Sequence, residues 1–179
     1  MKYSNLLLII LLVFSSCTRK TDQQLFQEGQ DAQGKKDFLL AIEKYQELID
    51  QHANSSHADS AQLLVALIYN NDLRDMERAV RAYQKVYTFF PQSTMAPTAM
   101  FLAGFIFNNE LHKLDTAKLM YETFLQKYPE HELAASAKFE MESFGKDPMQ
   151  FIPQELIVPE TTKTTAVKEP PPAPKKKKH

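Results

Sequence analysis

The feature that most constrains the fold of this chain is a sequence repeat of 38 residues. The segment DFLLAIEKYQELI at 37–49 recurs as DMERAVRAYQKVY at 75–87 and as KLDTAKLMYETFL at 113–125. Such a period is typical of helical-repeat proteins, in which each unit buries its apolar face against its neighbours. The same interval relates five sets of positions: Ala41, Ala79 and Ala117; Tyr45, Tyr83 and Tyr121; Leu25, Leu63, Phe101 and Phe139; Ala61, Ala99 and Ala137; Pro91 and Pro129.

Each repeat unit is expected to form two helices joined by a short turn. Along residues 38–49, apolar side chains recur at positions i, i+3, i+4 and i+7, which predicts one buried helical stripe. The alanine at the fixed position lets two helices approach closely, and the tyrosine four residues later fills the space beside it. The pattern therefore predicts an all-α fold of helical hairpins.

The ends of these helices are marked by residues that stop a helix. Pro91 and Pro129 are expected to end the second helices, because proline cannot donate to the helical hydrogen-bond ladder. Glycine and asparagine tolerate left-handed conformations and so suit C-caps. The expected C-caps of the first helices are Gly34, Asn70–Asn71 and Asn108–Asn109.

The alanine, the tyrosine and the terminal proline of the second helix resemble the tetratricopeptide repeat (TPR), whose usual unit has 34 residues. In this chain the unit is lengthened after the proline, as in FPQSTMAPTAMF and YPEHELAASAKF. This lengthened form is similar to the repeats of the BamD and CpoB (YbgF) families of bacterial envelope proteins. The resemblance implies a right-handed α-solenoid of antiparallel helix hairpins, with about three and a half repeats and a disordered C-terminal tail.

The repeat stops within its fourth copy. Residues 134–145 (AASAKFEMESFG) align with the first helices of the earlier units, but no second helix is expected to follow. Phe139 and Phe144 are expected to pack inward, while charged residues cover the other side. A polar outer face is typical of the terminal helix of a solenoid. The repeat domain is therefore assigned to residues 22–146.

The N-terminus has the order of an export signal. Nine apolar residues, 6–14, follow a weakly positive start and precede two serines. The run is far shorter than the ~20 residues that span a bilayer as a helix. The ending FSSC resembles the lipobox of bacterial lipoproteins, and Cys17 is the only cysteine in the chain.

The lipobox resemblance implies a lipoprotein signal peptide at 1–16 and a lipidated linker at 17–21. Cys17 would become the first mature residue, carrying palmitate or related acyl chains that anchor the protein to a membrane. Thr18, rather than Asp, follows the cysteine, and the resemblance then favours the outer membrane with the protein facing the periplasm. The alternative is an ordinary cleaved signal in which Cys17 has no role.

The charge and the motifs disfavour several function classes. Residues 21–160 hold 21 Asp and Glu against 12 Lys and Arg, a net charge of −9, whereas 161–179 carry +5. An acidic body with a short basic tail does not indicate a nucleic-acid binder. The chain has no HExxH, nucleophile elbow, P-loop or GxGxxG motif, so no catalytic, cofactor-binding or metal-binding residues are expected. The protein is not expected to be an enzyme.

The segments after the repeat domain differ in composition. Residues 147–158 form a short apolar extension, and 159–179 contain five Pro, six Lys and no aromatic residue. The second segment cannot bury enough apolar area to offset its ordering entropy, which predicts a disordered tail. Its KKKKH end suits either an anionic lipid or wall polymer, or solvent alone.

In the TPR family, first helices line a groove that holds a partner peptide or helix. The groove residues carried over by this resemblance are Phe26, Leu64, Val65, Ile68, Leu102 and Ile106. The alternatives are that these residues are helix-packing core, or that the chain's own 147–158 covers them. The implied function is a membrane-anchored interaction scaffold that binds envelope proteins, first in outer-membrane protein assembly. A Tol–Pal, wall or division adaptor is the alternative, and an envelope hydrolase or its accessory subunit is the weakest candidate.

Overall fold

The computed structural model describes residues 19–144 and 146. Within them the chain forms helices and turns without strands, which confirms the all-α prediction. The predictions made for the signal peptide, Cys17, the apolar extension and the tail lie outside the described residues. The helices are α2 (Asp22–Gly34), α3 (Phe38–Gln51), α4 (Ala58–Leu67) with the π-turn η1 (Ile68–Asp72), α5 (Met76–Phe89), α6 (Ala96–Asn109), α7 (Leu114–Lys127) and α8 (Ala134–Ser143).

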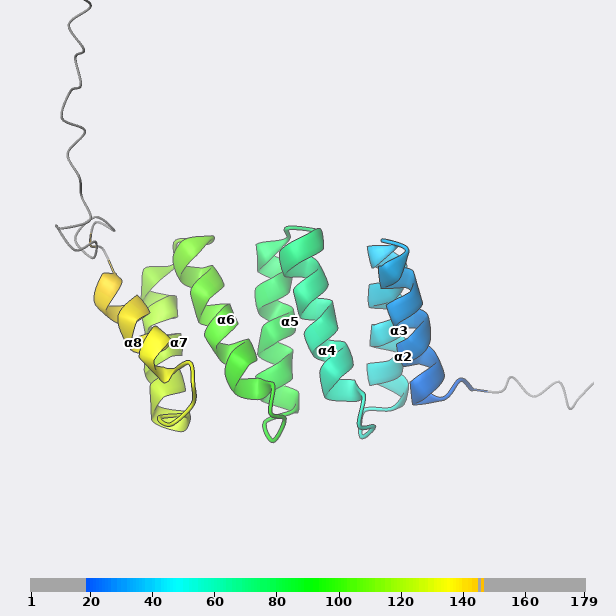
Figure 1. Cartoon of the computed structure of the whole chain (residues 1–179). Helices are drawn as coiled ribbons and strands as arrows, with labels where there is room; N and C mark the ends of the chain where they lie inside the picture. Colours follow the sequence, from blue (N-terminus) through cyan, green and yellow to red (C-terminus); the bar gives the residue numbers. More distant parts are fainter. Residues whose placement is uncertain (1–18, 145, 147–179) are drawn as a thin grey trace, which may run out of the picture. The chain divides into compact units, whose positions relative to one another are not determined.

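The helices pack in chain order, each against the next, as a solenoid of helical hairpins. In Figure 1 the first helices of the units, α2, α4, α6 and α8, lie in front of the second helices α3, α5 and α7. The turns that connect successive units lie together along one edge, and the turns within units lie along the other. The TPR-like arrangement of three and a half units is therefore confirmed.

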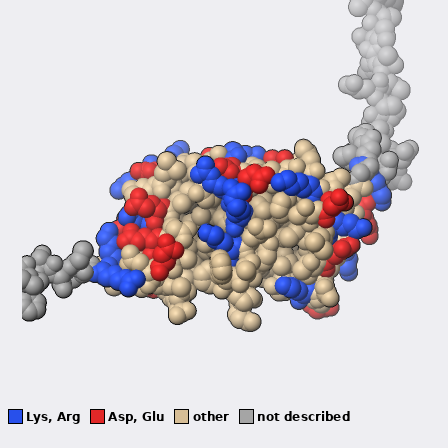
Figure 2. Space-filling view, turned by 180° about the vertical axis from the view of Figure 1, so that it is seen from behind, with Lys and Arg blue, Asp and Glu red and all other residues tan. Residues whose placement is uncertain are grey.

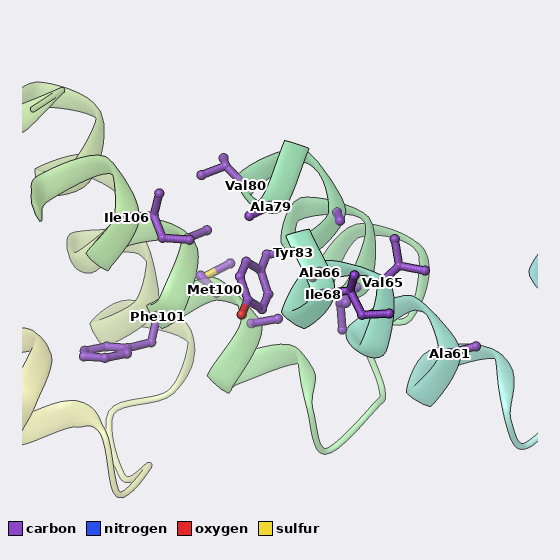
Figure 3. Close-up of a cluster of buried hydrophobic side chains, with 14 of the residues drawn as sticks. Ala61, Val65, Ala66, Ile68, Ala79, Val80, Tyr83, Met100, Phe101 and Ile106 are labelled. Carbon is purple, nitrogen blue, oxygen red and sulfur yellow. The ribbon is translucent and has the colours of Figure 1, made fainter. Parts of the chain in front are cut away.

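The core follows the predicted alanine and tyrosine positions. Ala41, Ala79 and Ala117 on the second helices are each 0% exposed, and so are the three tyrosines that follow them by four residues. Figure 3 shows one of these rings, Tyr83, with Ala66 and Ile68 on one side and Met100 on the other. Each tyrosine thus fills the space between its own hairpin and the next first helix.

The first helix of unit 1 is displaced by one residue from the 38-residue register. Asp22 accepts a hydrogen bond from the turn that follows α3, and Asp59, 37 residues later, makes the matching bond in the next unit. The turn after α2 is closed on the carbonyl of Ala32, and the next two on Tyr69 and Phe107. The predicted equivalence of Leu25 with Leu63 and Phe101 is therefore wrong by one residue.

The additional residue of unit 2 is accommodated by the π-turn η1. The amide of Leu73 donates to the carbonyl of Ile68, five residues earlier, at 3.0 Å. A π-turn inserts one residue into a helix without ending it. With this correction, Phe26 takes the place of Phe101, and each ring lies beside the tyrosine of its own unit, 5.8 Å from Tyr45 and 5.6 Å from Tyr121.

The helix ends follow the prolines but not the predicted C-caps. The residues before Pro91 and Pro129 are the C-caps of α5 and α7, as predicted. The left-handed residues after the first helices are instead three others, which lie 38 residues apart: Lys36, Arg74 and His112. The turn bends just before the second helix, so the left-handed conformation falls there, and the glycine and asparagines remain in the preceding helical turns.

Phe139 departs from the prediction that it packs inward, because 51% of it is exposed. Its equivalent Phe101 is covered by the second helix of its unit, through ring contacts with Tyr121 and Phe124. No helix follows α8 within the described residues. Phe144 does pack against the domain, with its ring 6.1 Å from Tyr121.

Candidate partner-binding site

The predicted groove residues divide into two groups in the structure. Val65, Ile68 and Ile106 are only 0–3% exposed and belong to the hydrophobic core. Their side chains offer a partner no surface in this structure, so they are removed from the groove. Phe26, Leu64 and Leu102 are half-buried and remain accessible.

A continuous candidate surface emerges on the first-helix face when Leu67 and Phe105 are added. Leu64 and Leu67 lie on successive turns of α4, and Leu102 and Phe105 take the same positions on α6, one repeat later. We call these four residues the apolar strip. Phe105 is 37% exposed and its ring stacks 6.5 Å from Phe101, which holds it at the surface. The i, i+3 spacing from Leu64 and Leu102 is the sequence signal that would have found the two added residues.

The apolar strip is bounded by polar helices. In the corrected register, Gln27 and Gln30 on α2 take the positions of Leu64 and Leu67. On the other side, Glu140 of α8 takes the position of Leu102 and accepts a 2.9 Å hydrogen bond from Nδ2 of Asn108. This bond holds α8 against α6. The strip is therefore an apolar patch on two helices with a polar rim, which suits the apolar side chains of a protein segment.

The N-terminal junction is fixed by polar contacts to the turn between α3 and α4. Arg19 donates from Nε to Oε1 of Gln51 at 3.0 Å, and Nε2 of His52 donates to the carbonyl of Lys20 at 2.9 Å. Asp22 accepts from the hydroxyl of Ser55 at 2.8 Å and lies 3.2 Å from Nδ1 of His57.

These contacts to Asp22 have an electrostatic consequence. The hydrogen bonds from Ser55 and His57 stabilise the charged carboxylate and lower the pKa of Asp22 to about 2. The junction is thus a polar lock between the start of α2 and the first inter-unit turn. His52 and His57 serve this lock, in agreement with their prediction as loop residues.

Two searches of the described residues concern other functions. They contain no group of three or more His, Cys, Asp and Glu side chains placed to hold a metal ion. None of the helices in 19–144 has the length and apolar character needed to cross a membrane.

The fold and the surface of this molecule define a class: a short TPR-like helical-repeat protein, built for contact with other proteins rather than around a catalytic centre. Residues 18–147 match the family described as "YfiO: Outer membrane lipoprotein". The match covers most of the chain and all of the solenoid, so the protein belongs to this family and is an outer membrane lipoprotein. A comparison with curated proteins found no match.

Proposed function

We propose that this lipoprotein is a non-catalytic scaffold for outer-membrane protein assembly, and that the apolar strip binds an apolar segment of a partner in the periplasm. The observation that carries the proposal is the strip itself, which Leu64, Leu67, Leu102 and Phe105 form on two neighbouring first helices. Exposed apolar patches with a polar rim mark interaction sites on soluble domains. Membership of the outer membrane lipoprotein family supports the location.

The membrane anchor is proposed to be lipid on Cys17. Support comes from the FSSC sequence, the absence of any other cysteine, and the family match, which begins at the next residue. Two or three acyl chains give stable anchoring, which one chain does not. The Cys17→Ser protein should lose incorporation of labelled palmitate and leave the membrane fraction or remain unprocessed. A Cys17→Ser protein that is still processed and still sediments with membranes contradicts the anchor.

The partner surface is tested by capture from detergent-solubilised envelopes. We expect the double variant Leu67→Glu, Phe105→Glu to lose its partner while circular dichroism and the melting temperature stay close to wild type. Leu119→Glu is the matched control, because Leu119 is 63% exposed on α7, away from the first-helix face. It should capture partners normally. Equal capture by both variants would remove the strip from the proposal.

The identity of the captured proteins tests the assembly role separately. Recovery of barrel-assembly components supports it, whereas recovery of Tol–Pal, wall-synthesis or division components would assign the scaffold to those processes. Deletion of residues 147–179 tests the apolar extension in the same assay. Tighter capture by the truncated chain would show that 147–158 competes for the apolar strip. Weaker retention on anionic vesicles would instead assign the lysine tail to lipid.

A further inference from the structure

One edge of the solenoid combines three properties that point to a lipid surface. We call it the turn edge and define it by the three turns that connect successive units, residues 52–57, 90–95 and 128–133, with the last residue of the helix before each. These last residues are Gln51, Phe89 and Lys127.

The first property is the position of the chain's N-terminal junction. Arg19 donates two hydrogen bonds to Gln51, to Oε1 at 3.0 Å and to the carbonyl at 3.2 Å, so it is held on the turn edge. Cys17 precedes Arg19 by two residues in the sequence. Two residues span at most ~7 Å even when fully extended. An acyl chain on Cys17 would therefore bring the turn edge to the bilayer surface.

The second property is the lack of charge on the two turns nearest this junction. Residues 52–57 (HANSSH) and 90–95 (FPQSTM) contain no Asp, Glu, Lys or Arg. Figure 2 shows uncharged surface on the two projections of the lower edge, while charged residues reappear near the C-terminal end. Removing such turns from bulk water costs little, because no charge has to be desolvated.

The third property is an exposed aromatic ring at the centre of the edge. Phe89 ends α5 and is 68% exposed. It borders a hollow of about 430 Å³ between the first two turns, which Ala53, Pro91 and Ser93 also line. An exposed phenylalanine costs free energy in water and gains it at a membrane interface. The core does not use this ring.

We propose that the turn edge lies on the membrane surface, with Phe89 inserted at the level of the lipid headgroups. The proposal rests on the lipid anchor at Cys17 argued above. Contact is confined to the first two turns, because the third carries Glu130 and Glu132, which an anionic surface repels. In this orientation the second-helix and first-helix faces both stand perpendicular to the bilayer, which leaves the apolar strip open to a partner.

The test uses tryptophan fluorescence, since the natural chain contains no tryptophan. The full-length lipidated protein carrying Phe89→Trp is reconstituted into phosphatidylethanolamine–phosphatidylglycerol vesicles with or without brominated acyl chains. Leu39→Trp is the matched control, because Leu39 is also 68% exposed but lies at the opposite end of its helix. A helix of 14 residues is ~20 Å long, which places the control beyond the reach of the bromines.

We expect Phe89→Trp to show blue-shifted emission and about a twofold loss of intensity with brominated lipid, because an aromatic ring at the interface contacts the acyl chains. Leu39→Trp should be unaffected. Equal quenching of the two variants, or none for Phe89→Trp in protein that floats with the vesicles, overturns the membrane-facing edge and leaves the anchor intact. Protein that does not float overturns both. A blue shift without bromine quenching would place a protein on the edge and likewise overturns the proposal.

Discussion

The carboxylate of Asp22 accepts a 2.8 Å hydrogen bond from the hydroxyl of Ser55, and one unit later Asp59 accepts a 2.7 Å bond from Ser93. Each bond ties the start of a first helix to the turn that follows the second helix of the same unit. The hairpin is thereby closed at the end where its covalent connection is absent. In unit 3 the matching acceptor position is Pro97, which has no side-chain acceptor, so only the first two units are locked this way.

The Asp22 lock predicts a specific loss of stability in acid. The pKa of Asp22 falls from 3.8 to about 2 on folding, because Ser55 and His57 hydrogen-bond to its charged form. Below 3.8 the unfolded state binds the proton first, so this contribution is complete above that pH and is lost as the pH falls to about 2. Asp22→Asn should flatten the dependence of the urea midpoint on pH across this window, and Ser55→Ala should flatten it in part. An unchanged slope in Asp22→Asn would show that the lock does not act through this carboxylate.

The repeat period predicted the core because it is a statement about side chains. Ala41 and Tyr45 and their equivalents were placed correctly, since small and large residues at a fixed interval require the same helix crossing in every unit. The one-residue shift of α2 could not be found in this way. It depends on whether the backbone forms a π-turn after Ile68, and apolar residues at both Leu25 and Phe26 fit the pattern equally well.

The candidate site was predicted in part for a related reason. A period identifies which residues are equivalent, but it does not show which side of a helix meets the next helix. Leu64 and Ile68 lie one turn apart on the same helical segment, yet only Ile68 is fully buried. The turn edge was missed altogether, because its position relative to the N-terminus follows from hydrogen bonds such as that between Arg19 and Gln51, 32 residues apart.

A second prediction concerns close packing at Gly29. A Cβ added there would lie 2.7 Å from Cδ1 of the fully buried Tyr45 ring, which has no room to move. Alanine favours a helix over glycine by about 1 kcal/mol, but overpacking costs about 1–3 kcal/mol and prevails. Gly29→Ala should therefore lower the free energy of unfolding in urea.

Gly34→Ala is the matched control on the same helix, because an added Cβ meets nothing within 4 Å. It should leave the free energy of unfolding unchanged or raise it by up to about 1 kcal/mol through helix propensity. If the two glycine variants are equally stable, the close contact between α2 and the Tyr45 ring is incorrect.

A third prediction tests the helix crossings of the repeat. Ala79 is 0% exposed where α5 meets its neighbours, so Ala79→Phe should overpack the hairpin and cost about 1–3 kcal/mol. Arg81→Phe places the same side chain on the exposed side of α5 and should change stability by no more than about 0.5 kcal/mol. Equal losses of melting temperature would show that the alanine register does not mark the crossings.

The last prediction compares two buried tyrosines that differ in their hydrogen bonds. Burial raises the pKa of Tyr45 to about 12, so its hydroxyl keeps the proton and donates to Oε1 of Gln33 at 3.2 Å. The Tyr121 hydroxyl is equally buried but has no hydrogen-bond partner among the described residues. A net hydrogen bond contributes about 1 kcal/mol, whereas a buried hydroxyl without a partner costs about 1–3 kcal/mol. In urea unfolding followed by circular dichroism, Tyr45→Phe should lower the free energy of unfolding by about 1 kcal/mol, and Tyr121→Phe should raise it or leave it unchanged. A loss in Tyr121→Phe as large as that in Tyr45→Phe would show that the Tyr121 hydroxyl is satisfied in solution, and would remove the asymmetry between the first and third units.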